Sequence, residues 1–231
     1  MGKIATYVFF DVATDGTFTI AELCMIAVKR KHIELREKEP RTQNKFKLCF
    51  WFRDYNEKYT RPESFKEVFY IDEKFNEDVC NSVNSFLSCL EKPVCIIAHD
   101  GFNLHFPLLK YRFSRFKCSL PDDLLCTDSI YAFYDLMALE DKQLSKSSRS
   151  KRNKPGVKLY KYLVRKTFYD EVPTESYELC DIYNRVINGD LTPDDTENHC
   201  KMIMQLAIEK SKEFVTWVEG NHCRLSEVPR F

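Results

Sequence analysis

The chain has 231 residues, of which 44% are hydrophobic and 14% are aromatic, and its 35 basic and 35 acidic side chains cancel. This length and apolar content suffice for one sizeable core, so we expect a single domain over residues 1–231. The balanced charge excludes a protein that binds polyanions through net charge alone, and no apolar run reaches the roughly 18 residues of a membrane-spanning helix.

The chain contains ten cysteines, which could indicate a disulfide scaffold. Such scaffolds are small and have little apolar core, whereas Cys24, Cys49, Cys95 and Cys126 each lie inside an apolar run. We therefore expect reduced core thiols, and the start of the chain shows no secretion signal. Both features predict a cytoplasmic or nuclear protein.

The first half of the chain is rich in strand-forming residues. Two β-rich runs, at residues 5–12 and 17–30, are separated by the turn signal "ATDG" and predict a hairpin. A third β-rich run follows at residues 45–54. The segment 75–92 then carries apolar residues at helical spacing, and Asn76 is its expected N-cap.

From Pro93 onward, the patterns of strands and helices alternate. The run "VCIIA" at residues 94–98 is short, β-branched and apolar on both faces, which predicts a buried parallel strand. A further strand is expected at residues 123–130, and helices are expected at residues 106–116, 130–140, 176–189 and 195–220. Three early strands followed by this alternation predict an α/β layered domain with a mixed sheet.

One segment is strongly basic. Residues 142–166 contain ten basic side chains and no acid, with two tyrosines among them. This pattern suits an arm that binds phosphates and stacks bases, and its candidate contacts are Lys146, Arg149, Lys151, Arg152, Lys154, Lys158 and Tyr160. The alternative is a solvated, flexible loop around residues 141–156, followed by the basic face of a helix.

Several motifs resemble, in order and over nearly the whole chain, those of the three-prime repair exonuclease (TREX) group of the DEDDh 3′-to-5′ exonucleases. They are "FFDVATDG" with "IAELCMIAV", "VCIIAHDGFNLHFPLL", "LLCTDSI", "SYELCDIYNRVING" and "TWVEGNH". The resemblance implies an RNase H-like fold, a mixed central sheet flanked by helices. It also implies two-metal phosphodiester hydrolysis, in which four acids hold two Mg²⁺ ions and a histidine activates water.

The catalytic positions of that family are largely replaced in this chain. The first acid is kept as Asp11, but the glutamate two residues later is Ala13, and the aspartate of the second motif is His105. The third motif of the family, H-x-x-x-x-D, aligns with residues Asp195 to Cys200, and neither its histidine nor its aspartate is present. Mg²⁺ prefers hard oxygen ligands, so we expect Mg²⁺-dependent exonuclease activity to be lost and no cofactor to be required.

Other polar residues near these motifs have simpler explanations. Asp15 is expected in a turn, and Asp100 is expected to cap the helix that follows it. His199 neighbours Cys200, and helical geometry should turn it about 100° away from the direction of Cys200. The alternative is a working nuclease whose shifted metal site combines Asp11 with Asp15, Asp100 or Asp195.

Two explanations remain open for the replaced metal positions. Asp11, His105 and Cys200 should lie together in this fold, and such a set of side chains suits a transition metal. A structural zinc ion is therefore one hypothesis. The other is that the ligands were lost without replacement.

The predicted function is a catalytically inactive exonuclease-like domain that acts as a binding module or scaffold. Its partner is single-stranded DNA or RNA, bound by the basic segment, or a protein, and no membrane is expected. Phe50, Trp51 and Phe52 are consecutive, so at strand period at least one large ring points away from the core. The resemblance implies a homodimer through residues 46–53, with an edge formed by Lys47, Cys49, Phe50, Trp51 and Phe52; the alternative is a strand buried on both faces.

Overall fold

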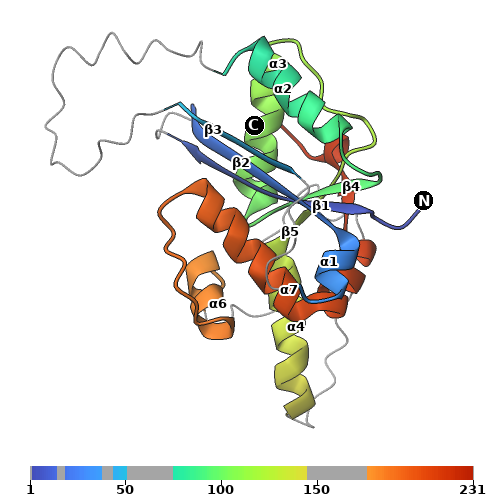
Figure 1. The fold of residues 1–231 in the computed structure, drawn as a ribbon, viewed down its shortest axis with the longest axis vertical. Coiled ribbons are helices and arrows are strands. Elements are labelled where there is room, and N and C mark those ends of the chain that lie inside the picture. Colours follow the sequence, from blue (N-terminus) through green and yellow to red (C-terminus); the bar gives the residue numbers. More distant parts are fainter. Residues whose placement is uncertain (1, 15–18, 38–43, 51–74, 145–175, 231) are drawn as a thin grey trace, which may run out of the picture.

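A six-stranded mixed sheet with helices on both faces forms the centre of the protein (Figure 1). This computed structural model describes residues 2–14, 19–37, 44–50, 75–144 and 176–230, and the side chains of all of these except 138–144. The strand order is β3-β2-β1-β4-β5-β6. The strands are β1 (Thr6–Thr14), β2 (Ile20–Lys29), β3 (Asn44–Cys49), β4 (Val94–Ala98), β5 (Leu125–Asp128) and β6 (Cys223–Arg224).

The sheet is mixed because its centre is parallel and its two sides are antiparallel. β1, β4 and β5 run parallel, whereas β2 and β3 continue the sheet as antiparallel neighbours on one side and β6 closes it on the other. The prediction of a buried parallel strand at residues 94–98 is confirmed, because β4 lies between two parallel strands and is buried throughout. The α/β class with a mixed sheet is likewise confirmed.

The expected helices are present, with bounds a few residues from those predicted. They are α2 (Glu77–Ser88), α3 (Phe106–Arg115), α4 (Ser129–Leu144), α6 (Leu179–Val186) and α7 (Thr196–Gly220). The short helix α1 (Arg30–Glu34), the π-helical turn η3 (Gly101–His105) before α3 and the short 3₁₀ helix η5 (Leu225–Glu227) were not predicted. Asn76 caps α2 as predicted, since its side chain accepts a hydrogen bond from the Val79 N–H at 3.1 Å.

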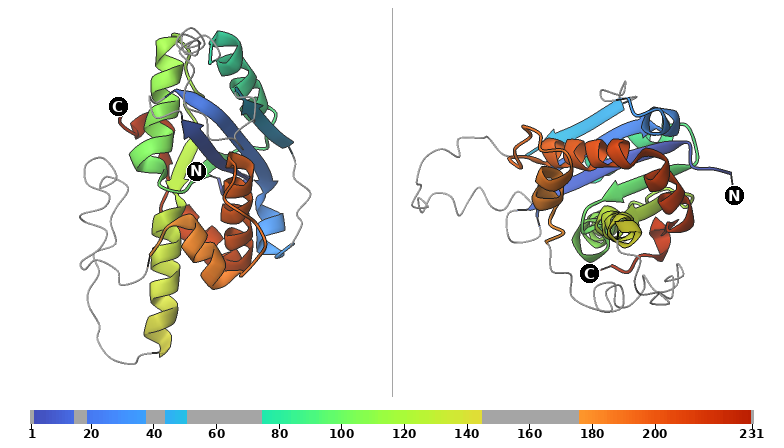
Figure 2. Two further views of the ribbon diagram at one scale, coloured as in Figure 1. Left: turned by 90° about the vertical axis from the view of Figure 1, so that its left-hand side faces the viewer. Right: turned by 90° about the horizontal axis from the view of Figure 1, so that it is seen from below.

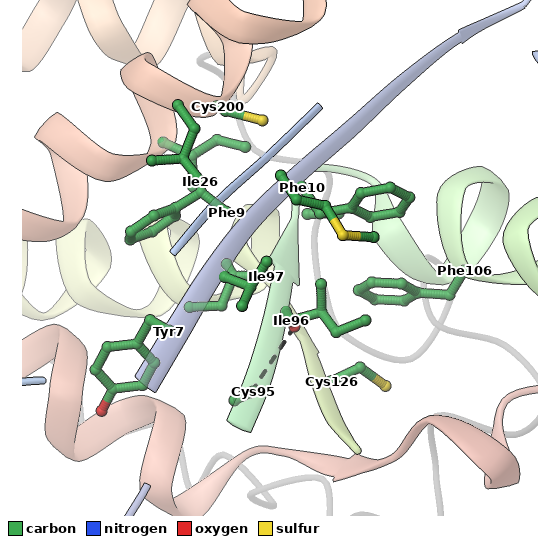
Figure 3. Close-up of a cluster of buried hydrophobic side chains, with 14 of the residues drawn as sticks. Tyr7, Phe9, Phe10, Ile26, Cys95, Ile96, Ile97, Phe106, Cys126 and Cys200 are labelled. Carbon is green, nitrogen blue, oxygen red and sulfur yellow. Dashed lines mark hydrogen bonds between the residues drawn. The ribbon is translucent and has the colours of Figure 1, made fainter. Parts of the chain in front are cut away.

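The alternation of side chains along β1 divides the core into two layers. Phe10 points to the layer of α2 and α3, where its ring stacks on Phe106 with 6.4 Å between centroids. Phe9 points to the opposite layer, on the side of Ile26 and Cys200 (Figure 3). α7 covers that second face, with α6 beside it (Figure 2).

Several predictions fall on residues outside the described ranges. They include the seven candidate nucleic-acid contacts between Lys146 and Tyr160, the two aromatic residues Trp51 and Phe52, and Asp15. The flexible loop was expected to begin at residue 141, which is wrong for residues 141–144, because α4 continues through them to Leu144. No helix in the described ranges is both long and apolar enough to cross a membrane.

Candidate functional site

Three polar side chains from three separate elements meet at one edge of the sheet. Asp11 lies near the end of β1, His105 ends the turn η3 that follows β4, and His199 lies in the first turns of α7. The carboxyl ends of parallel strands share one edge, and sites in open α/β sheets form there. We call Asp11, His105 and His199 the Asp-His-His cluster.

The central contact of the cluster joins Asp11 and His199. The His199 Nδ1 lies 2.9 Å from the Asp11 Oδ2, a hydrogen bond of ordinary length between imidazole and carboxylate. The hydrogen bond to Asp11 raises the pKa of His199 above its usual value. The hydrogen bond therefore favours the imidazolium form of His199 beside the buried Asp11 side chain.

His105 approaches the other oxygen of the same carboxylate. Its Nε2 lies 3.4 Å from the Asp11 Oδ1, and its ring meets Phe10 edge-on. Burial lowers the pKa of His105, so this ring is neutral at physiological pH. Its Nδ1 is also buried and has no hydrogen-bond partner among the described residues.

The structure corrects the expected alignment of the third motif. His199, expected to point away, is the residue of α7 that reaches Asp11. Cys200 instead points into the core, where its thiol lies 3.5 Å from the Cys24 carbonyl oxygen and beside Ile26 in Figure 3. The structure thus brings Asp11 and His105 together as predicted, but not with Cys200.

The pattern of α7 contained the signal for this difference. Cys200, Ile203, Met204 and Ala207 recur at the spacing of one apolar helical face, and all four are buried. The residue before Cys200 is turned about 100° from that face, which directs His199 to the edge of the helix beside β1. The motif therefore shifts by one residue, and His199 stands where the last carboxylate was expected at position 200.

The position of the missing glutamate has no metal-binding group. Ala13 is exposed near the end of β1 and pairs across the ladder with Glu22 of β2. Paired residues of an antiparallel ladder point to the same face. The Glu22 carboxylate does not replace the missing acid, because it forms an ion pair with Lys47 of β3 at 3.0 Å.

Lys47 binds a group of three carboxylates beside the Asp-His-His cluster. Besides Glu22, its ammonium contacts Asp195 at 3.1 Å and Glu197 at 3.4 Å, both at the start of α7. Burial alone would lower the pKa of Lys47, but hydrogen bonds to Glu22 and Asp195 outweigh burial and raise it. Lys47 therefore stays charged and ties the edge strand to the first turn of α7.

Two acids that were candidates for a shifted metal site have structural partners. Asp195 is the N-cap of α7 and accepts a hydrogen bond from the Asn198 N–H at 2.7 Å. Asp100 was expected to cap the following helix, which is wrong, because its side chain makes no capping bond and accepts one from the Asn103 amide at 2.7 Å. Its left-handed backbone (φ 59°) is a conformation that Asp and Asn tolerate better than most residues.

Asp128 holds the turn that carries His105. Its two carboxylate oxygens accept hydrogen bonds from the backbone N–H groups of Asp100, Phe102 and Ile130 at 3.0, 3.1 and 3.1 Å. Burial raises the pKa of Asp128 to about 7, and the three N–H donors oppose that rise. Asp128 therefore organises the backbone of the β4–η3 turn.

The residues of the cluster do not fit Mg²⁺. Mg²⁺ requires hard oxygen ligands in near-octahedral geometry, whereas this cluster offers one carboxylate and two imidazoles. One oxygen of this carboxylate is also hydrogen-bonded to His199, and the other lies 3.4 Å from the His105 Nε2. Within the described ranges, no three His, Cys, Asp or Glu side chains already surround a point where a metal ion would bind.

The expected dimer edge is partly described. Among the strands in the described ranges, β3 is the outermost on its side of the sheet, and its residues are exposed or half-buried. The alternative of a strand buried on both faces is therefore wrong for Asn44–Cys49. Phe50 follows the strand, is half-buried, and its N–H donates to the Ala21 carbonyl oxygen at 2.8 Å.

Comparison with known proteins agrees with the resemblance seen in the motifs. No family model matches the chain. The chain is 25% identical to three prime repair exonuclease 2 of Mus musculus in an alignment 233 positions long, which covers 94% of this chain and 88% of the relative. It is 30% identical to the Homo sapiens protein of the same name in an alignment 149 positions long, which covers 58% of this chain and 63% of the relative. It is also 24% identical to three-prime repair exonuclease 1 of Bos taurus in an alignment 241 positions long, which covers 95% of this chain and 68% of the relative.

Replacing Asp128 with Asn should destabilise the protein. The carboxamide of the variant keeps one acceptor oxygen but turns an NH₂ toward a backbone N–H, so one buried donor loses its partner. We expect the free energy of unfolding at pH 8 to fall by about 1–3 kcal/mol in urea titrations. The control is Asp123→Asn at the surface, where only an exposed ion pair with Lys92 is lost. An equal effect of the two substitutions would contradict the assigned role of Asp128.

Acid should destabilise the protein through His99, which follows β4. Its Nε2 lies 2.9 Å from the Tyr177 carbonyl oxygen and its Nδ1 lies 3.0 Å from the Ser129 hydroxyl. Burial lowers the pKa of His99 to about 4, so the unfolded chain binds a proton before the folded one does. The stability that neutral His99 contributes is complete above the unfolded pKa of about 6.5 and is lost as the pH falls toward 4.

The measurement is the free energy of unfolding of the wild type and of His99→Gln between pH 7.5 and pH 4.5. The variant lacks the titrating ring, so its stability should fall less steeply over this range. His105 titrates in the same direction as His99, whereas His199, with its raised pKa, opposes both. An identical slope in wild type and variant would show that His99 is not a source of the acid sensitivity.

Proposed function

The chain is a relative of the three prime repair exonucleases, and we propose that it binds nucleic acid without hydrolysing it in Mg²⁺. The observation that carries the loss of hydrolysis is the state of Asp11. This one retained acid is hydrogen-bonded to His199 on one oxygen and approached by the neutral His105 ring on the other. With Ala13 at the glutamate position, no second carboxylate among the described residues is placed to hold Mg²⁺ beside it.

Two features support nucleic acid as the ligand. The relatives are exonucleases by name, and exonucleases act on nucleic acids. The basic segment at residues 142–166 adds ten cations without an acid, which suits phosphate contacts. The Lys47 ammonium is unsuited to this role, because three carboxylates already surround it.

The alternative of a working nuclease with a shifted metal site has less support. It needs Asp100 or Asp195 to turn toward Asp11, or Asp15, which lies outside the described residues. Asp195 caps α7 and pairs with Lys47, and Asp100 accepts the Asn103 amide. Both acids would have to give up these bonds, and catalytic groups tolerate little displacement from productive geometry.

The central prediction combines a binding assay with a cleavage assay. A labelled single strand of about 15 nucleotides, as DNA and as RNA, is titrated with the protein, and fluorescence anisotropy reports binding. We expect saturable binding that weakens as salt increases, because phosphate contacts release counterions. The same strands incubated with the protein and Mg²⁺ should keep their length in denaturing gels.

A restored variant tests whether the replaced residues are the cause. Ala13→Glu, His105→Asp and His199→Asp return the three acids, and Asp194→His places a histidine five residues before position 199. If this combination folds and shortens the strands in Mg²⁺ while the wild type does not, the loss of hydrolysis lies at these positions. Shortening by the unmodified protein would overturn the proposal.

A second variant tests the binding arm. Replacing Lys151, Arg152 and Lys154 together with Gln should weaken binding and flatten its salt dependence. Replacing Lys29, Lys31 and Lys92, three cations that lie outside the basic segment in the sequence, with Gln is the matched control. Equal affinities of the two triple variants would exclude the basic segment as the contact.

The position of β3 supports a further property, self-association through this edge strand. An exposed edge strand can add a strand from another chain. Because the Phe50 N–H points to β2, the alternation of an antiparallel ladder directs the N–H of Lys45, at the same parity of β3 as Cys49, away from β2. A second copy pairing with β3 would use that outward side of the strand.

Lys45→Pro should therefore disrupt the dimer while leaving the sheet intact. Proline removes one outward N–H and keeps the inward bond of Phe50. We expect light scattering to give a dimer mass for the wild type and for Lys45→Ala, which retains the N–H, and a monomer mass for Lys45→Pro. A dimer that survives the proline, or a monomeric wild type at micromolar concentration, would reject this interface.

A further inference from the structure

We propose that Cys126 and Cys223 form a reversible disulfide when hydrogen peroxide oxidises the protein. Cys126 lies in the strand β5 and Cys223 lies in β6, and both are free thiols in the structure, with their Sγ atoms 3.6 Å apart. The bond would join two residues that are 97 positions apart in the sequence. This inference does not depend on the proposed nucleic-acid binding.

The backbone around this cysteine pair suits a disulfide. β5 and β6 are antiparallel, and Cys126 lies directly opposite Cys223. The Leu225 N–H donates to the Leu124 carbonyl oxygen at 2.8 Å, so alternation along the ladder makes the two cysteines a hydrogen-bonded pair as well. Such a pair has Cα atoms about 5.5 Å apart, within the roughly 4.4–6.8 Å that disulfides span. We therefore expect side-chain rotation to bring the sulfurs to bonding distance without separating the strands.

A buried cysteine in the neighbouring strand β4 is directed to the other face of the sheet. Cys95 lies opposite Leu125 in the register of β4 and β5. The next residue, Ile96, lies opposite Cys126. Because side chains alternate between the two faces of a sheet, Cys95 and Cys126 lie on opposite faces. Cys223, and not Cys95, is therefore the cysteine that shares a face with Cys126.

Burial protects the pair while β6 is closed on β5. Cys126 is fully buried, and Cys223 is 5% exposed. Burial raises the pKa of the Cys126 thiol well above its ordinary value, so this thiol is uncharged and a poor nucleophile. β6 has two residues, and a short segment held by few backbone bonds opens at a lower free energy than a central strand. Opening of β6 therefore exposes Cys223 to the oxidant.

The reaction consumes one hydrogen peroxide and two thiols. The Cys223 thiolate attacks one peroxide oxygen and the O–O bond breaks, which leaves a sulfenic acid and a hydroxide that takes a proton to become water. When β6 closes, the Cys126 thiol attacks the sulfenic sulfur, loses its proton and releases the hydroxyl group as a second water. Both sulfurs are oxidised and both peroxide oxygens are reduced. A dithiol reductant reverses the bond by thiol–disulfide exchange.

The disulfide would reinforce the strand that carries Asp128. Asp128 follows Cys126 by two residues, and its carboxylate holds the β4–η3 turn. Between them, the Thr127 hydroxyl donates to the Asn221 carbonyl oxygen at 2.7 Å, just after α7. The disulfide would close a loop that includes α7 and would restrict the unfolded chain. We therefore expect the oxidised protein to be more stable than the reduced protein.

The test uses the full chain, reduced with dithiothreitol, freed of the reductant and treated with hydrogen peroxide. Remaining thiols are blocked with iodoacetamide in denaturant, and fragment spectra of a non-reducing tryptic digest assign the linked cysteines. We expect a link between Cys126 and Cys223. The melting temperature (Tm) should rise by about 10 °C, and dithiothreitol should reverse the rise. Absence of this link at a peroxide dose that oxidises the exposed Cys89, or a link from Cys126 to Cys95, would overturn the proposal.

Variants assign the change in Tm to this bond. Cys223→Ala should lose both the link and the rise in Tm that peroxide causes. Cys89→Ala removes an exposed cysteine at the end of α2, and this matched control should keep both. If Cys223→Ala does not fold, Cys223→Val, which fills more of the buried space, replaces it with the same expectation.

The outcomes separate this inference from the proposed function. An undiminished rise in Tm in folded Cys223→Ala would assign the effect of peroxide to another site and reject the disulfide as its cause. Anisotropy and gel assays of the fully reduced protein report on nucleic-acid binding whatever the result of the peroxide treatment.

Discussion

The hydrogen bond between the Asp11 carboxylate and the His199 imidazole determines the character of this domain. A buried carboxylate is costly unless a hydrogen bond or a cation accompanies it. Here His199 of the covering helix α7 supplies the hydrogen bond. Asp11 can therefore remain buried although Ala13 and His105 place no second carboxylate beside it.

The fold around this contact follows from the alternation of side chains along the strands. In β1, Phe10 faces α3, whereas Phe9 and Asp11 face the layer of α7, so a single strand supplies two cores and the site. The same alternation in β3 turns Phe46 to the ring of Phe86 in α2 and Lys47 to the first turn of α7. The ion pairs of Lys47 thus lie on the face of β3 opposite to Phe46.

Much of this architecture could be predicted from local patterns. The run at residues 94–98 is apolar on both faces because a central parallel strand is buried on both, and Asn76 begins α2 because its side chain accepts an orphan N–H. β6 was not foreseen, since its two residues are too few to show a period. The prediction placed Cys200 at the site and turned His199 away, because it aligned the chain by the motif alone. Cys200 belongs to the buried apolar face of α7, and this leaves His199 to reach Asp11.

The environments of Ala13 and His105 differ in how easily each position could accommodate an acid. Ala13 is exposed near a strand end, so a glutamate could stand there without disturbing any packing. The imidazole of His105 packs edge-on against Phe10 inside the fold, and a smaller aspartate would leave a void costing on the order of 1 kcal/mol. Aspartate at position 105 would thus need compensating changes in its neighbours, whereas glutamate at position 13 could be introduced alone.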